Sequence, residues 1–358
     1  MLKLTISTFL LLCSVLNAKC IDSCTTKKYY NAIHKAEKEI LENDFKSATQ
    51  HYKKAFKYLK YPFSNDLLVA SICMLKSKEN NISQLKLWSK IYQYQTNQSI
   101  ENKIKEFDLY KRTSYHGKLS NEDWTIISKD TTIHSVYRKK LSNQLDDIWK
   151  KDQGIRRAME EKFGLEKYWV PEGRKQIIYV DSLNLVTVDS IIETEEFSQY
   201  TVGDENLGVM MLVLLHNSQW QTDKVYAVAN KLKQKVIAGN IYNRTFSRTF
   251  DRFCDNATEE NPKINCARSQ FYGENSYWIY NNYHTYINFG DENLKKINSN
   301  REEIFLVSIE ERIKQLGYQI NKENLFFIRS TMWSELSDEK LKKIQHFISK
   351  GDLILIKE

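Results

Sequence analysis

The chain has 358 residues and a net charge of +8, with 53 Lys and Arg against 45 Asp and Glu. Apolar residues make up 41% of the sequence, which supports folded cores and excludes a disordered chain, while only 3 Pro and 11 Gly favour helices over tight turns. The positive charge is spread along the sequence rather than gathered in a basic arm, so we expect no nucleic-acid partner.

Residues 1–18 have the pattern of a secretory signal peptide. A short basic start is followed by an apolar run from Leu4 to Leu16, which is too short to span a bilayer comfortably. We expect no lipid anchor at Cys20, because Lys19 occupies the position where that processing needs a small residue. The sequence therefore predicts an exported protein, periplasmic or extracellular, with no membrane span in its mature part. The alternative is that these residues form a buried first helix.

Residues 19–99 are predicted to form helical pairs. Small and aromatic residues recur at helical spacing on both sides of a break at residues 43–44: Ala32, Ala36 and Ile40 before it, and Ala48, Tyr52 and Ala55 after it. This pattern resembles a tetratricopeptide repeat. A second, weaker pair is predicted at Leu67–Leu75 and Leu85–Tyr94. The resemblance implies binding of a peptide or protein partner through these helices, and the alternative is a helical spacer or cap.

Residues 100–140 are polar and irregular, and we predict a linker there that contains at most one short helix. A central helical domain is predicted over residues 141–275, beginning with a helix whose apolar stripe includes Leu145 and Ile148.

Within the central domain, polar residues stand among apolar helix positions, where a charge is costly unless it is paired. Their order is Asp152-Gln153 with Arg156, Asp181 with Asn184, Val202-Gly203, His216, Asp251-Arg252 and Tyr272-Gly273. This order resembles the domain of unknown function 6624, and the resemblance covers roughly residues 145–275. The family has no established activity, so the resemblance implies boundaries and candidate residues but no reaction.

One interpretation of these residues is catalytic. His216 could act as a general base whose ring is oriented by Asp251 or Asp152. Arg156 or Arg252 could hold an anionic substrate group through paired hydrogen bonds. These residue types would suit a metal-independent hydrolase or transferase.

A divalent cation is a further possibility for the same carboxylates, although no ligand spacing singles one out. The residues concerned are Asp152, Asp181, Asp251 and His216. No Cys or His pair has the spacing of a zinc site. We therefore predict neither a metal nor another cofactor.

The structural interpretation needs fewer assumptions. Asp152 and Arg156 would form a surface ion pair, the Asp251-Arg252 pair would satisfy helix ends, and His216 would interact with the dipole at a helix C-terminus. This interpretation predicts an exported binding or scaffolding protein of the cell envelope, with the hydrolase or transferase as the alternative.

Six cysteines remain to be placed, one of them in the predicted signal peptide. In an oxidising compartment Cys254 and Cys266 would form a local disulfide across the polar loop between them. Cys20 can pair with Cys24, which leaves Cys73 buried on an apolar helix.

Residues 276–358 are predicted as a small mixed α/β region. The expected elements are aromatic strands at Tyr277–Tyr280 and Tyr283–Phe289, a helix at Glu310–Leu316, a strand at 325–328, a helix at Asp338–Ile348 and a strand at Leu353–Ile356. The predicted fold class is therefore mainly α, with tetratricopeptide-like hairpins, a helical domain and a mixed α/β C-terminal piece.

Overall fold

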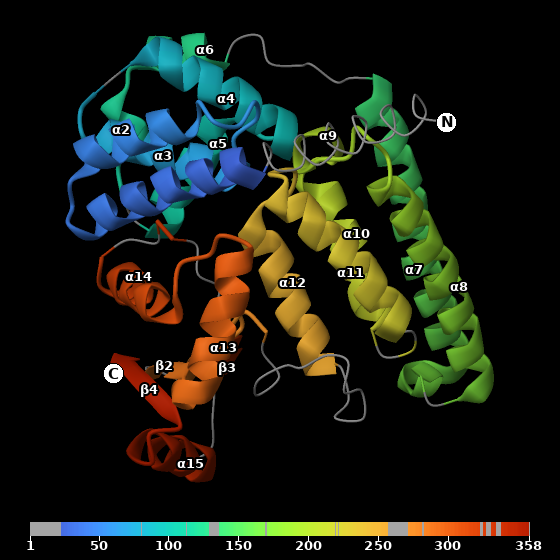
Figure 1. Cartoon of the computed structure of the whole chain (residues 1–358). Coiled ribbons are helices and arrows are strands. Elements are labelled where there is room, and N and C mark those ends of the chain that lie inside the picture. Colours follow the sequence, from blue (N-terminus) through green and yellow to red (C-terminus); the bar gives the residue numbers. More distant parts are fainter. Residues whose placement is uncertain are drawn as a thin grey trace, which may run out of the picture.

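The computed structural model describes residues 23–79, 81–111, 113–128, 136–168, 170–218, 220, 222–256, 271–280, 283–322, 325–326, 331–333 and 338–357. The predicted signal peptide lies outside these residues. The described part is mainly helical with a small sheet near the C-terminus, which confirms the predicted mainly α class with a mixed α/β C-terminal piece. Figure 1 shows the N-terminal helices at the upper left, the central helices at the right and the C-terminal elements below.

The N-terminal helices are those that the sequence predicts. They comprise a helix over residues 23–41, α2 (Phe45–Ala55), α3 (Ser64–Lys76) and α4 (Ile82–Thr96). Asn43 takes a left-handed φ of 62°, and the side chain of Asp44 caps α2 by accepting from the Ser47 backbone N–H. These two residues explain why the chain turns sharply between its first two helices.

The linker predicted over residues 100–140 is wrong for most of its length. The structure has α5 (Ile100–Lys111), the short 3₁₀ helix η1 (His116–Lys118) and α6 (Asn121–Ser128) there. Asp108 accepts hydrogen bonds from the backbone N–H groups of Tyr115 and His116, which closes the connection after α5. The sequence looks polar because each helix buries only a few apolar side chains.

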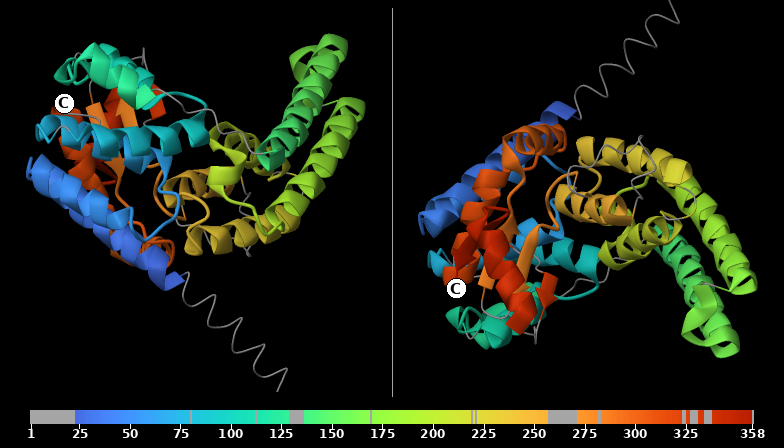
Figure 2. Two further views of the ribbon diagram at one scale, coloured as in Figure 1. Left: turned by 90° about the horizontal axis from the view of Figure 1, so that it is seen from above. Right: turned by 90° about the horizontal axis from the view of Figure 1, so that it is seen from below.

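The central helices begin with a long antiparallel hairpin. α7 (Val136–Phe163) and α8 (Pro171–Ile192) are joined by the 3₁₀ helix η2 (Gly164–Tyr168), and both views of Figure 2 show this pair extending away from the rest of the molecule. The chain continues through α9 (Gln199–Val202), α10 (Asp204–Asn217), α11 (Thr222–Ile237) and α12 (Asn243–Asn256). α10 packs against α7, α8 and α12.

The C-terminal region contains a mixed sheet of four described strands in the order β3-β1-β2-β4. β1 (Tyr277–Tyr280) and β2 (Tyr283–Ile287) are the two predicted aromatic strands, and they pair antiparallel. β3 (Thr331–Trp333) runs parallel to β1, and β4 (Leu353–Lys357) runs antiparallel to β2. The helices are α13 (Gly290–Glu303), α14 (Ile309–Asn321) and α15 (Asp338–Ser349).

Two details of this region differ from the prediction. α13 was not expected, because its mostly polar sequence buries little more than Ile297 and Arg301. The strand expected at 325–328 is not found over its described half, where Leu325 and Phe326 are buried without strand structure. Burial of large apolar side chains is compatible with either kind of backbone, so hydrophobicity alone misplaced this strand.

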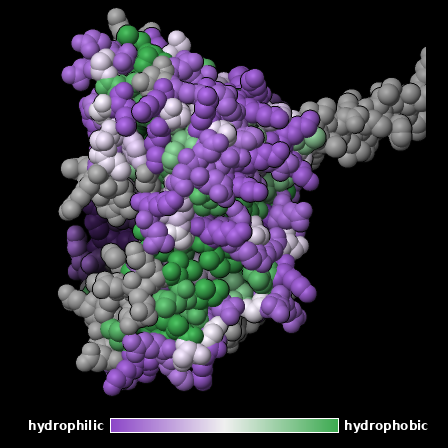
Figure 3. Space-filling view, turned by 90° about the vertical axis from the view of Figure 1, so that its left-hand side faces the viewer, coloured by the Kyte–Doolittle hydropathy of each residue, from purple (hydrophilic) through white to green (hydrophobic). Residues whose placement is uncertain are grey.

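The described residues form two hydrophobic cores. One unites the N-terminal helices with the C-terminal sheet, α13 and α14, and the other lies among the central helices. Figure 3 shows one face of the molecule, which is mostly hydrophilic in its upper part and has hydrophobic side chains gathered in its lower half. None of the described helices is long and apolar enough to cross a membrane. Because the first core contains residues of both parts, the C-terminal piece is packed on the N-terminal helices. The central helices separate these two parts in sequence.

Candidate functional site

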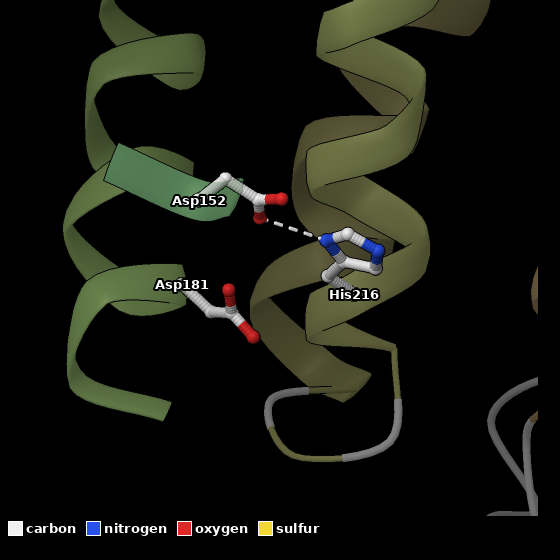
Figure 4. A group of neighbouring side chains, drawn as sticks. All are labelled: Asp152, Asp181 and His216. Atoms are coloured by element: carbon white, nitrogen blue, oxygen red, sulfur yellow. Dashed lines mark hydrogen bonds and ion pairs between the residues drawn. The ribbon is translucent and has the colours of Figure 1, made fainter. Parts of the chain in front are cut away.

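Three helices bring a small polar cluster together. Asp152 on α7, Asp181 on α8 and His216 in the last turn of α10 converge, as Figure 4 shows. His216 Nδ1 lies 2.8 Å from Asp152 Oδ1. An ionised carboxylate can only accept, so Nδ1 carries the proton and donates it. Both carboxylates are buried, whereas the His216 side chain keeps 24% of its surface exposed.

Arg156 completes the cluster from one turn beyond Asp152. Its Nη1 donates to Asp152 Oδ1 at 2.8 Å, and its Nη2 donates to both oxygens of Asp181 at 3.0 Å. The i, i+4 pair predicted from the sequence is therefore present. It is largely buried rather than on the surface, because the side chain of Asp152 is 3% exposed and that of Arg156 is 12% exposed. The small stabilisation typical of a solvent-exposed ion pair therefore does not describe it.

Further polar side chains fix the carboxylates. Gln153 Nε2 donates to Asp152 Oδ2 at 2.7 Å, and Asn217 Nδ2 donates to the backbone carbonyl of Asp181 at 2.9 Å. Asn184, one turn after Asp181, is also buried, and its side-chain nitrogen has no hydrogen-bond partner among the residues that the structure describes. No role for Asn217 was predicted from the sequence. Its position directly after His216 is the signal that could have indicated one.

The two carboxyl groups differ in their electrostatics. Burial alone would raise the pKa of Asp152, but the hydrogen bond from His216 and the charges of His216 and Arg156 hold it below its usual value. Burial raises the pKa of Asp181, and Arg156 only partly opposes the shift. With both carboxylates ionised, the single guanidinium of Arg156 leaves Asp152 and Asp181 together with one negative charge in excess.

The cluster could also bind a metal ion. One ligand atom each from Asp152, Asp181 and His216 lie within 4.8 Å of one another. Arg156 already contacts both carboxylates, so an ion would compete with a guanidinium charge, and His216 would have to lose its proton from Nδ1. The geometry therefore favours proton chemistry over metal binding.

Asp251 and Arg252 do not belong to this site, contrary to the catalytic interpretation. Asp251 is buried on α12 and accepts from the backbone N–H groups of Phe271, Tyr272 and Glu274 at 2.7, 2.7 and 2.5 Å. Burial raises its pKa to about 7, although the three donors oppose the shift. Arg252, the next residue, is exposed. Consecutive residues on a helix point in different directions, so the pair could not act together.

A second polar cluster joins all three parts of the chain, and it was not predicted from the sequence. Glu274 is buried between Arg301 Nη1 at 3.1 Å and Arg312 Nη2 at 2.8 Å. Nearby, Arg244 on α12 pairs with Glu37 of the first helix. These partners lie far apart in the sequence, so no local spacing could reveal them. They connect the N-terminal, central and C-terminal elements.

Asp66 is a further buried carboxyl group, and it predicts that the stability of the folded protein depends on pH. It accepts from Tyr29 Oη at 2.5 Å, and burial raises its pKa from 3.8 to about 7. Because the folded pKa is above the unfolded one, its contribution is complete below pH 4 and is lost as the pH rises to about 7. We expect the melting temperature to fall between pH 5 and pH 8.

Asp66→Asn should reduce this fall, because the amide imitates the neutral acid. Asp251, whose folded pKa is also about 7, supplies the part that remains. Asp147→Asn, at an exposed position on α7, is the control and should leave the fall unchanged. An equal fall in the Asp66 variant and in the control would contradict the assignment.

The structure describes only some of the cysteines for which predictions were made. The disulfide predicted between Cys254 and Cys266 lies outside the residues whose side chains the structure describes, as does Cys20. Cys24 is exposed, and Cys73 is buried on α3, as predicted.

Comparisons of the chain with protein-family models, curated proteins and solved structures gave no match. Both family resemblances therefore stay predictions.

Proposed function

We propose that the protein is a metal-independent hydrolase or transferase in which His216 acts as the general base. One observation carries the proposal: Asp152 fixes Nδ1 of the ring, while Nε2 has no partner among the described residues and the side chain is partly exposed. A histidine held in this way has one tautomer and one orientation, and its second nitrogen is available to a substrate.

The other residues of the cluster have supporting roles in this proposal. His216 Nε2 would accept a proton from a water molecule or a substrate hydroxyl. The positive charge that develops on the ring is stabilised by the carboxylate of Asp152, whose lowered pKa keeps it ionised. Arg156 holds Asp152 and Asp181 in place, so it is not free to bind a substrate anion. Arg252, the anion clamp expected from the sequence, is not part of the proposal.

Hydrolysis of p-nitrophenyl acetate and p-nitrophenyl phosphate tests the proposal. With whichever ester is cleaved, His216→Ala should lower turnover by about a hundredfold, the lower range for loss of a general base. His346→Ala is a matched control, because His346 also lies in the last turn of a helix and is exposed. EDTA should change nothing. Turnover that survives in His216→Ala, or that is abolished by the chelator, would contradict the proposal.

The second candidate is an exported binding or scaffolding protein of the cell envelope. In this proposal the N-terminal helices hold a peptide or protein partner. What supports it is a groove beside α2 and α4 in which Leu87 is 53% exposed. A large apolar side chain that stays exposed in a groove is a common feature of interaction sites. This function needs no catalytic residue, so loss of His216 would leave it intact.

A further inference from the structure

The groove of the N-terminal helices lies between one face of α4 and the C-terminal end of α2 with the segment that follows it, residues 56–62. It encloses about 860 Å³, within the range of sites that hold ligands. Phe56 and Trp88 meet edge to face at its base, with ring centroids 5.3 Å apart. The base is therefore rigid, because it is formed by packed aromatic rings on two helices.

The groove is apolar along α4. Leu87 and Ile91 are one helical turn apart, so both lie on the face of α4 that lines it. Leu87 is 53% exposed and Ile91 is half-buried. Covering such side chains with a partner removes apolar surface from water, which is the main source of affinity at most protein interfaces.

Its charge is entirely positive. Four lysines and no acidic residue are among the residues that line it. Lys53 is paired with Glu79 at 3.3 Å, but Lys54, Lys57 and Lys60 have no acidic partner among the described residues. Unpaired lysines around an apolar base complement carboxylates that flank apolar side chains.

We propose that this groove binds an acidic, amphipathic peptide segment of a partner protein. Apolar side chains of the segment would contact Leu87 and Ile91, and its carboxylates would face Lys54, Lys57 and Lys60. The inference rests on the second candidate function and is independent of His216. A membrane surface is a poorer match, because the apolar side chains line a hollow rather than a projecting face.

The experiment measures fluorescence anisotropy of three labelled 15-residue peptides with the full chain. The first alternates Glu and Leu at helical spacing, the second replaces each Glu by Lys, and the third replaces each Leu by Ser. Only the first should bind, and its affinity should fall as salt is raised. Leu87→Ser should weaken this binding about tenfold, and so should the double change Lys54→Glu and Lys57→Glu.

Leu183→Ser is a closely matched control, since Leu183 is 52% exposed on α8. It should bind like the unmodified chain, and so should His216→Ala, which separates this inference from the catalytic proposal. Equal binding of all three peptides, or equal affinity in the Leu87 and Leu183 variants, would overturn the proposal. It would also be overturned if no peptide binds while vesicles with anionic phospholipid do so in a Leu87-dependent way.

Discussion

Glu274→Gln should lower the free energy of unfolding by about 3–5 kcal/mol, the cost of breaking a buried ion pair by removing one partner. The substitution keeps the shape of the side chain and removes its charge, so Arg301 and Arg312 stay buried but lose the carboxylate with which both form ion pairs. Both arginine side chains are only 1% exposed, so water cannot replace the lost carboxylate. Denaturation in urea would measure the change.

Glu302→Gln, at an exposed position on α13, should have little effect in the same experiment. The pH dependence gives a second check. The charges of Arg312 and Arg301 outweigh burial and lower the pKa of Glu274 to about 2. Because the folded pKa is below the unfolded one, this stabilisation is present above pH 4.5 and is lost as the pH falls towards 2. A Glu274 variant as stable as the control at pH 7 would refute the role assigned to this carboxylate.

Asp251→Asn should destabilise the protein by about 3 kcal/mol at pH 8, where the carboxylate is ionised. The carboxylate accepts three backbone N–H groups, two at Oδ1 and one at Oδ2. An amide keeps only one acceptor oxygen, so its NH₂ group would face the N–H of Glu274. The segment that begins at Phe271 would lose its attachment to α12, and Glu274 with it.

The melting temperature of Asp251→Asn at pH 8 tests this, with Asp146→Asn at an exposed position on α7 as the comparison. Arg252→Ala, next to Asp251 but exposed, should melt like the unmodified protein. An unchanged melting temperature in Asp251→Asn would instead mean that the residue is retained for binding or chemistry, as the catalytic interpretation of the sequence had it.

Local patterns predicted much of the helical structure. The spacing of Ala32, Ala36 and Ala48 placed the first two helices, and the distance from Asp152 to Arg156 placed both on one helix face. Such patterns work because side chains three or four residues apart on a helix are neighbours. The pairing of His216 with Asp152 was one of two options, since nothing in the sequence distinguishes Asp152 from Asp251.

Long-range contacts account for the failures. The sequence predicts a linker in place of α5 and α6, because their few apolar residues, such as Ile104 and Trp124, are buried by helices elsewhere in the chain. Glu274 and its arginines were missed for the same reason, since the partner of each is set by the fold and not by spacing. Asp251 was assigned to catalysis because a buried carboxylate that binds backbone N–H groups looks the same in sequence as one that binds a histidine.

The first core has a consequence for the order in which the chain can fold. Its two halves, the N-terminal helices and the sheet with α13 and α14, are separated in sequence by all of the central helices. Contacts between such distant segments form slowly, because a long loop must close before they bring any stabilisation. The N-terminal helices are synthesised first, yet their apolar faces stay exposed until the C-terminal segment arrives. During that interval a nascent chain is prone to aggregate. The central helices have more local contacts, so they are able to fold before the C-terminal segment completes the first core.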